Sequence, residues 1–181
     1  GNAGPRTGAH HNAVDHHLHF VFAAAVGGGH GGQVAGLPIE PHAGEPGGPY
    51  LVAWQSADQD GSGTGVYGRL FDAAGNPLTG EIRLSQTTAR DQISPTVAWS
   101  PAGTFLAAWA SNGQDGNGFG IYARRIHGTT GQLLGDEFQV HVTTAGSQLA
   151  PRVAAQSSSF YVAWSGFRAG GYTTDIYARG F

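Results

Sequence analysis

The sequence contains no cysteine and no lysine, and its nine basic residues are all arginine. Without cysteine, the chain can form neither a disulfide framework nor a thiolate metal site. The arginines form no run or patch, and the formal net charge is −3, so we expect no nucleic-acid partner. The longest apolar run, residues 20–26, spans seven residues, which is far too short to cross a membrane. We therefore expect no membrane partner either.

The chain also lacks an initiator methionine and the basic start of a secretory signal, which predicts that it is processed or cut from something longer. Its 181 residues are enough to bury the core of one domain. Glycine is the commonest residue, with 31 copies, as expected of many short strands joined by tight turns.

The chain repeats itself three times with a period of 55 residues. An apolar motif that ends in Ala-Trp recurs at Trp54, Trp109 and Trp164. A second motif, Tyr-Gly-Arg or Tyr-Ala-Arg, keeps the same period and ends at Arg69, Arg124 and Arg179. Two motifs in one register over three copies establish an internal repeat, and the repeat defines the architecture.

Each copy contains short β-rich runs separated by loops rich in Gly, Asp and Pro. The predicted strands of the first copy are residues 50–56, 65–71, 81–85 and 95–100. Those of the second copy are residues 105–110, 119–126, 137–142 and 151–156. The third copy ends after its second strand.

Four consecutive antiparallel strands form a small sheet that cannot bury both faces alone, and radial stacking of such sheets gives a β-propeller. We therefore predict an all-β fold, an incomplete β-propeller of about three four-stranded blades. One blade is complete, around residues 94–142, and two are partial. Since propellers have roughly four to eight blades and open sheet edges attract other chains, we predict a homo-oligomer. A dimer that closes a six-bladed ring is favoured.

The repeats resemble a family of tandem repeats in large bacterial surface and secreted proteins. The resemblance covers about residues 50–181 and implies propeller-like blades and a bacterial secreted or cell-surface origin. It rests on residues 54–56, 59–63, 66–67 and 71–78, which read Trp-Gln-Ser, Gln-Asp-Gly-Ser-Gly, Val-Tyr and Phe-Asp-Ala-Ala-Gly-Asn-Pro-Leu.

Residues 1–49 differ from the repeats and form a separate segment, first rich in histidine and then in Gly and Pro. Five of the nine histidines fall between positions 10 and 19. Two structures remain open for residues 12–26. Asn12 is a candidate cap for a helix, whereas residues 18–26 have the composition of a buried strand related to the Trp-bearing one. The strand is slightly favoured.

Neutral imidazole is the commonest protein ligand for metals, and imidazole with carboxylate suits zinc. On a strand, His17 and His19 share a face. On a helix, His16 and His19 share a face, as do Asp15 and His19. We therefore predict a divalent-metal site, with zinc favoured, whose candidate ligands are His10, His11, His16, His17, His19 and His30.

Residues 15–19 also resemble the His/Asp-rich metal segments of metal-dependent hydrolases. Zinc with an open coordination position lowers the pKa of a bound water and so creates a nucleophile near neutral pH. The predicted function is a metal-dependent hydrolase that acts on an ester or phosphoester of a small molecule, with Asp15 and His19 as catalytic residues. The alternative is a propeller module that binds a glycan or a protein without catalysis.

Three further features have two interpretations each. Asp58 and Asp60 lie in a loop with the alternating oxygen ligands that calcium favours, but Gly113 replaces Asp58 in the next copy, which favours turn formation. The repeated arginines either line a channel that attracts anions or, as we favour, bind loop carboxylates or carbonyls. The tryptophans are predicted to pack in the core in preference to stacking on sugars.

Overall fold

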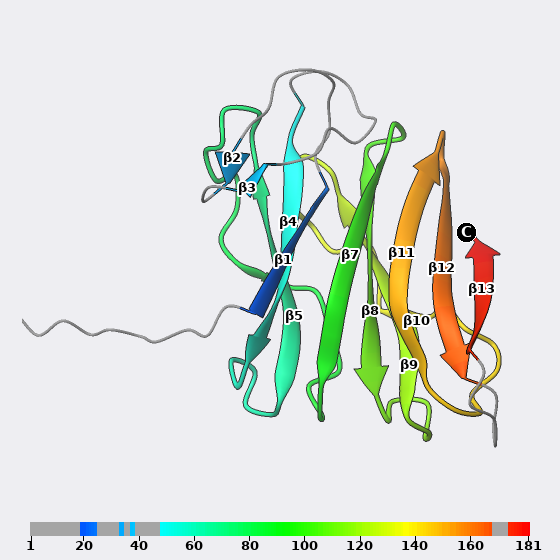
Figure 1. Cartoon of the computed structure of the whole chain (residues 1–181). Coiled ribbons are helices and arrows are strands. Elements are labelled where there is room, and N and C mark those ends of the chain that lie inside the picture. The colour runs from blue at the N-terminus through cyan, green and yellow to red at the C-terminus, as the bar shows by residue number, and fades with distance from the viewer. Residues whose placement is uncertain (1–18, 25–32, 35–36, 39–47, 168–173) are drawn as a thin grey trace, which may run out of the picture.

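The computed structural model describes residues 19–24, 33–34, 37–38, 48–167 and 174–181. All regular secondary structure in these residues is β-strand, which confirms the all-β prediction. Within the same residues no helix is long and apolar enough to span a membrane. The strands form three antiparallel sheets that lie one beside the next, and the described sheets do not close into a ring (Figure 1).

The three sheets follow the order of the chain. The first contains β1 (His19–Ala24), β4 (Tyr50–Ala57), β5 (Thr64–Phe71) and β6 (Ile82–Arg83). The second contains β7 (Gln92–Ser100), β8 (Thr104–Asn112), β9 (Phe119–His127) and β10 (Phe138–Gln139). The third contains β11 (Gln148–Gln156), β12 (Ser159–Phe167) and β13 (Thr174–Gly180). A separate two-stranded hairpin joins β2 (Gln33–Val34) to β3 (Leu37–Pro38).

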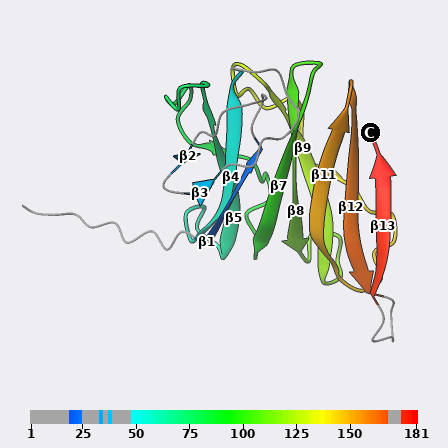
Figure 2. The same cartoon turned by 45° about the horizontal axis from the view of Figure 1, so that its top comes forward.

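The second and third sheets each begin with the strand that ends the preceding copy of the repeat, as the predicted blade around residues 94–142 requires. The first strands β1, β7 and β11 lie along one side of the stack, and β7 contacts both of the others (Figures 1 and 2). The last strands β6 and β10 lie at the opposite edge of their sheets. The third sheet has no fourth strand among the described residues.

Over residues 19–24 the strand alternative is correct, but β1 is not a counterpart of the Trp-bearing strand. It pairs with that strand, β4, in a register that joins Ala24 to Leu51. A bulge interrupts the pairing after His19, and similar bulges follow Ile93 in β7 and Leu149 in β11. β1 therefore occupies the place of β7 and β11, and the first sheet has four strands rather than the partial set predicted.

The third strands of the copies are shorter than predicted, since β6 and β10 contain only two residues each. The chain leaves the sheet because side chains replace backbone as hydrogen-bond partners. The Ser85 hydroxyl accepts the N–H of Val66 at 3.1 Å, and His141 Nδ1 accepts the N–H of Ile121 at 3.0 Å. The backbone is then free to turn toward the next sheet.

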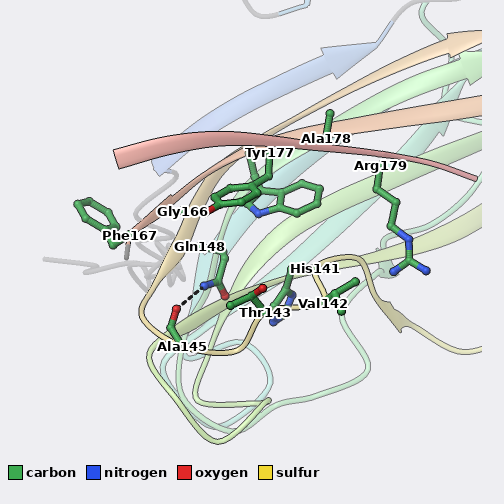
Figure 3. Close-up of a pocket in the computed structure, with 11 residues that line it drawn as sticks. His141, Val142, Thr143, Ala145, Gln148, Gly166, Phe167, Tyr177, Ala178 and Arg179 are labelled. Carbon is green, nitrogen blue, oxygen red and sulfur yellow. Dashed lines mark hydrogen bonds between the residues drawn. The ribbon is translucent and has the colours of Figure 1, made fainter. Parts of the chain in front are cut away.

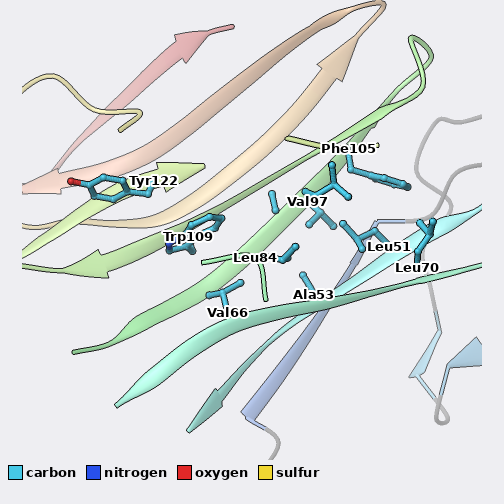
Figure 4. Close-up of a cluster of buried hydrophobic side chains, with 11 residues drawn as sticks. Leu51, Ala53, Val66, Leu70, Leu84, Val97, Phe105, Trp109 and Tyr122 are labelled. Atoms are coloured by element: carbon cyan, nitrogen blue, oxygen red, sulfur yellow. The ribbon is translucent and has the colours of Figure 1, made fainter. Parts of the chain in front are cut away.

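Two buried clusters hold the stack together. The first lies between the first and second sheets and includes Leu51, Val66, Phe105 and Trp109 (Figure 4). The second lies between the second and third sheets and includes Ile121, Val140, Phe160 and Trp164. The second sheet thus presents one face to the first sheet and the other to the third. Among the described residues no sheet packs on the outer face of the third sheet.

Candidate functional site

Most of the predicted metal and catalytic residues lie outside the described part of the chain. They are His10, His11, Asp15, His16, His17 and His30. Only the backbone of His19 is placed, at the start of β1. Among the described residues, no three His, Cys, Asp or Glu side chains gather into a group that could hold a metal ion. The zinc site and its hydrolytic chemistry therefore stay predictions.

The loop that carries Asp58 and Asp60 forms a tight turn. Asp58 has a left-handed backbone with φ of 58°, and its counterpart Gly113 has φ of 70°. The N–H of Asp58 donates to the carbonyl of Gly63 at 2.6 Å. The same bond recurs in the second sheet, from the N–H of Gly113 to the carbonyl of Gly118 at 2.5 Å. Asx residues and glycine tolerate this conformation best, so the loop geometry supports the turn interpretation. Calcium binding remains an untested prediction.

The repeated arginines bind carbonyls: Arg69 binds that of Thr79 within the first sheet, whereas Arg124 and Arg179 tie neighbouring sheets together. Arg124 Nη1 donates to the carbonyl of Leu84 at 3.3 Å, which joins the second sheet to the first. Arg179 Nη1 donates in the same way to Val140 at 3.0 Å, which joins the third sheet to the second. This confirms the structural interpretation of the arginines. The tryptophan prediction is also confirmed for Trp109 and Trp164, which are both buried.

A buried histidine–aspartate pair lies beside the junction of the second and third sheets. His141 Nε2 is 2.7 Å from Asp115 Oδ2, and both side chains are 1% exposed. His141 Nδ1 accepts the N–H of Ile121 at 3.0 Å and also lies 3.1 Å from the carbonyl oxygen of Ile121, so both ring nitrogens have hydrogen-bond partners. Gly120 makes the pairing possible, because a Cβ there would lie 2.5 Å from the imidazole Cε1.

Tyr122 packs edge-on against the imidazole of His141, with ring centroids 5.9 Å apart. Burial, together with the charges of Asp115 and Glu137, raises the pKa of Tyr122 to about 12. In the first sheet Ser85 replaces the histidine, and Asp60 Oδ2 is buried without a hydrogen-bond partner among the described residues. The pair is therefore a local feature of the second sheet.

The carboxylate of Glu137 fastens the outer edge of the second sheet to the loop that leaves the first. It accepts hydrogen bonds from the N–H groups of Gln86 at 2.7 Å and Thr87 at 3.0 Å. The Thr87 hydroxyl and Gln114 Nε2 donate to it as well. Its counterpart in the first sheet, Glu81, accepts a bond from Gln59 at 2.7 Å. Among the described residues the third sheet has no fourth strand and therefore no counterpart of the Glu137 contact.

A cavity of about 490 Å³ lies between the third sheet and the loop after β10 (Figure 3). Trp164 and Tyr177 stack with their centroids 6.1 Å apart and form an apolar wall. Opposite them, Gln148 donates to the carbonyl of Ala145 at 3.2 Å and holds the loop in place. The other lining residues are His141, Val142, Thr143, Gly166, Phe167, Ala178 and Arg179. The cavity is the candidate binding site of the described chain.

The opposite face of the third sheet carries exposed apolar side chains. Ile176 is 74% exposed, whereas its counterpart in the second sheet, Ile121, is 0% exposed. Tyr161 is 49% exposed, and its counterpart Leu106 is again fully buried. Exposed apolar patches of this kind mark interaction sites.

No protein-family model matches the sequence, and no curated protein matches it. Among solved structures, the chain is similar to a protein of unknown function from Dyadobacter fermentans DSM 18053, with a TM-score of 0.49 and 14% sequence identity. The similarity covers 79% of this chain and 39% of that one, so this chain spans well under half of the other protein's length. It carries no argument about fold or function.

Proposed function

We propose that this chain is a binding module of stacked propeller-type sheets that associates with other β-sheet polypeptides through its third sheet, first of all with a second copy of itself. The exposure of Ile176 carries the proposal, since the same position is fully buried in the two preceding sheets, as Val66 and Ile121. Full burial of a side chain of this size contributes about 1.5–3 kcal/mol. In the two preceding sheets this position is covered by the next sheet of the repeat, so a β-sheet is the expected partner of this face.

The burial of the first sheet favours a symmetric dimer over a six-bladed ring. A head-to-tail ring would place the third sheet against the outer face of the first sheet in the next copy. That face carries Tyr50, Val52 and Tyr67, which are only 8%, 5% and 5% exposed. Because it is already buried, the partner for Ile176 is the third sheet of a second copy, in an isologous contact.

Replacing Ile176 by Asp is expected to disperse the dimer, because a charge would then have to be buried in the contact. Light scattering on the wild type should give about twice the chain mass of 18.7 kDa, and the variant should give the monomer mass. Leu78→Asp is the matched control, since Leu78 is 48% exposed but lies in the first sheet's turn. A wild type that stays monomeric, or a Leu78→Asp variant that dissociates equally, would contradict the proposal.

The second proposal is the metal-dependent hydrolase, and the density of histidines between positions 10 and 19 favours it. Protein purified without chelator is expected to contain stoichiometric zinc, and His19→Ala should remove both metal and hydrolysis. Because ligands must be neutral, binding should weaken as pH falls through histidine's ordinary pKa of about 6.5. Elemental analysis is the measurement. Wild-type protein that contains no metal would contradict this proposal.

A further inference from the structure

We propose that the cavity beside β13 accepts an extended peptide with the pattern Glu, Ile or Phe, a polar residue, then Leu or Val. This pattern occurs at residues 81–84 and 137–140, the fourth-strand segments of the first two sheets. The inference rests on the proposed binding function and names the partner by its chemistry. The peptide would add a strand to the third sheet, and its carboxylate would bind the loop that leaves the second sheet.

The carboxylate site follows from the equivalence of two loops. Residues 85–92 and 141–148 leave successive sheets, and each contains a buried glutamine that donates to two carbonyls of its own loop, Gln92 and Gln148. In the first loop the N–H groups of Gln86 and Thr87 bind Glu137. Their counterparts are Val142 and Thr143, both of which line the cavity.

The donors of the second loop are available to a ligand. No hydrogen bond joins the N–H groups of Val142 and Thr143, or the Thr143 hydroxyl, to the described part of the chain. Val142 is also 78% exposed, so a peptide can approach this end of the cavity from solvent. Three donors directed at one carboxylate form a charge-assisted site, which is stronger than a set of neutral hydrogen bonds.

The strand site follows from the edge of the third sheet. In the second sheet, β10 pairs with β9 so that Gln139 lies opposite Tyr122 and Phe138 opposite Ala123. Their counterparts in β13 are Tyr177 and Ala178, which pair only with β12 among the described strands. A peptide in the β10 register would thus place its glutamate at the loop donors. An unpaired strand edge beside a preformed cavity is suited to strand addition.

The two apolar residues of the peptide also have a predicted position. In the second sheet, Phe138 packs against Phe181 with centroids 5.2 Å apart, and Val140 is fully buried in the cluster between the sheets. Strand alternation puts both side chains on the face opposite the glutamate. A peptide on β13 would therefore cover the side of the sheet that carries Ile176 with its apolar residues, while its glutamate entered the cavity.

The test is binding of a fluorescently labelled heptapeptide, residues 135–141 of this chain, to the full chain by anisotropy. We expect saturable 1:1 binding, weakened roughly tenfold or more when the peptide carries Glu137→Gln, because the charge-assisted bonds are lost. Thr143→Val in the protein should weaken binding several-fold, since it removes one donor without changing shape. Ala178→Pro should abolish it by removing an outward N–H, and proline is tolerated at a strand edge.

Melting curves establish that both protein variants remain folded. Equal binding of the Glu and Gln peptides, full binding by Ala178→Pro, or no binding at millimolar peptide would overturn the inference. If Thr143→Val converted the dimer to a monomer, the cavity would be assigned to a second copy of the chain. This result would also overturn the inference. If the peptide does not bind while Ile176→Asp still disperses the dimer, the peptide inference is wrong and the dimer proposal stands. If the peptide binds while Ile176→Asp has no effect, the dimer proposal alone is wrong.

Discussion

Replacing Trp109 by alanine is expected to lower the free energy of unfolding by about 3–5 kcal/mol, the usual cost of truncating a buried aromatic side chain. Trp109 is 0% exposed and belongs to the cluster between the first and second sheets. The second sheet has neighbours on both sides, so its packing has little room to collapse into the space left behind. Urea denaturation followed by far-UV circular dichroism measures the loss.

Trp164 is the matched control, because it is the same repeat position one sheet later. It is 7% exposed and borders the cavity of about 490 Å³, so part of its ring already lacks packing partners. Trp164→Ala should therefore cost clearly less than Trp109→Ala. Equal losses for the two variants, or a loss below 1 kcal/mol for Trp109→Ala, would mean that the sheets do not stack as described.

Replacing Glu137 by glutamine is expected to lower the free energy of unfolding by about 2 kcal/mol, since charge-assisted bonds contribute about 1.5–3 kcal/mol each when buried and less when water reaches them. The carboxylate accepts from Gln86, Thr87 and Gln114. A glutamine offers one oxygen, and its amide N–H₂ would face backbone N–H groups. The same denaturation experiment measures the change.

Glu81→Gln provides the control at the equivalent position of the first sheet. The Glu81 side chain accepts a hydrogen bond from Gln59 in an exposed contact, so the expected change is within about 0.5 kcal/mol. If Glu81→Gln lowered the free energy of unfolding as much as Glu137→Gln does, this would contradict the assignment of the Glu137 carboxylate as a link between the sheets. It would also weaken the case for a carboxylate site at Thr143.

The repeat made most of the fold predictable. Period and composition located the strands that carry Trp54 and Trp109 to within two residues, because β-rich runs between Gly/Asp turns are a local signal. The packing of the tryptophans and the carbonyl contacts of Arg124 and Arg179 also followed from the repeat. A side chain that recurs at the same position in every sheet is more easily explained by a structural role than by a role in a single functional site.

The features that escaped prediction are those without a repeating signal. His141 has serine as its counterpart, so nothing in the period pointed to its pairing with Asp115. The place of β1 depends on its register with β4, which its sequence does not reveal. The cavity beside Tyr177 borders the third sheet, which has no fourth strand among the described residues, and Thr143 becomes a candidate donor only through its equivalence to Thr87.

Hydrogen exchange at dilute and at concentrated protein tests the central claim, that the third sheet is the binding surface, most directly. Dimerisation through the face of Ile176 predicts that amides in β12 and β13 gain protection with concentration, while those of β8 and β9 stay unchanged. Ile176→Asp should remove the concentration dependence. Protection that rises instead in β4 and β5, or in no strand at all, would contradict the account.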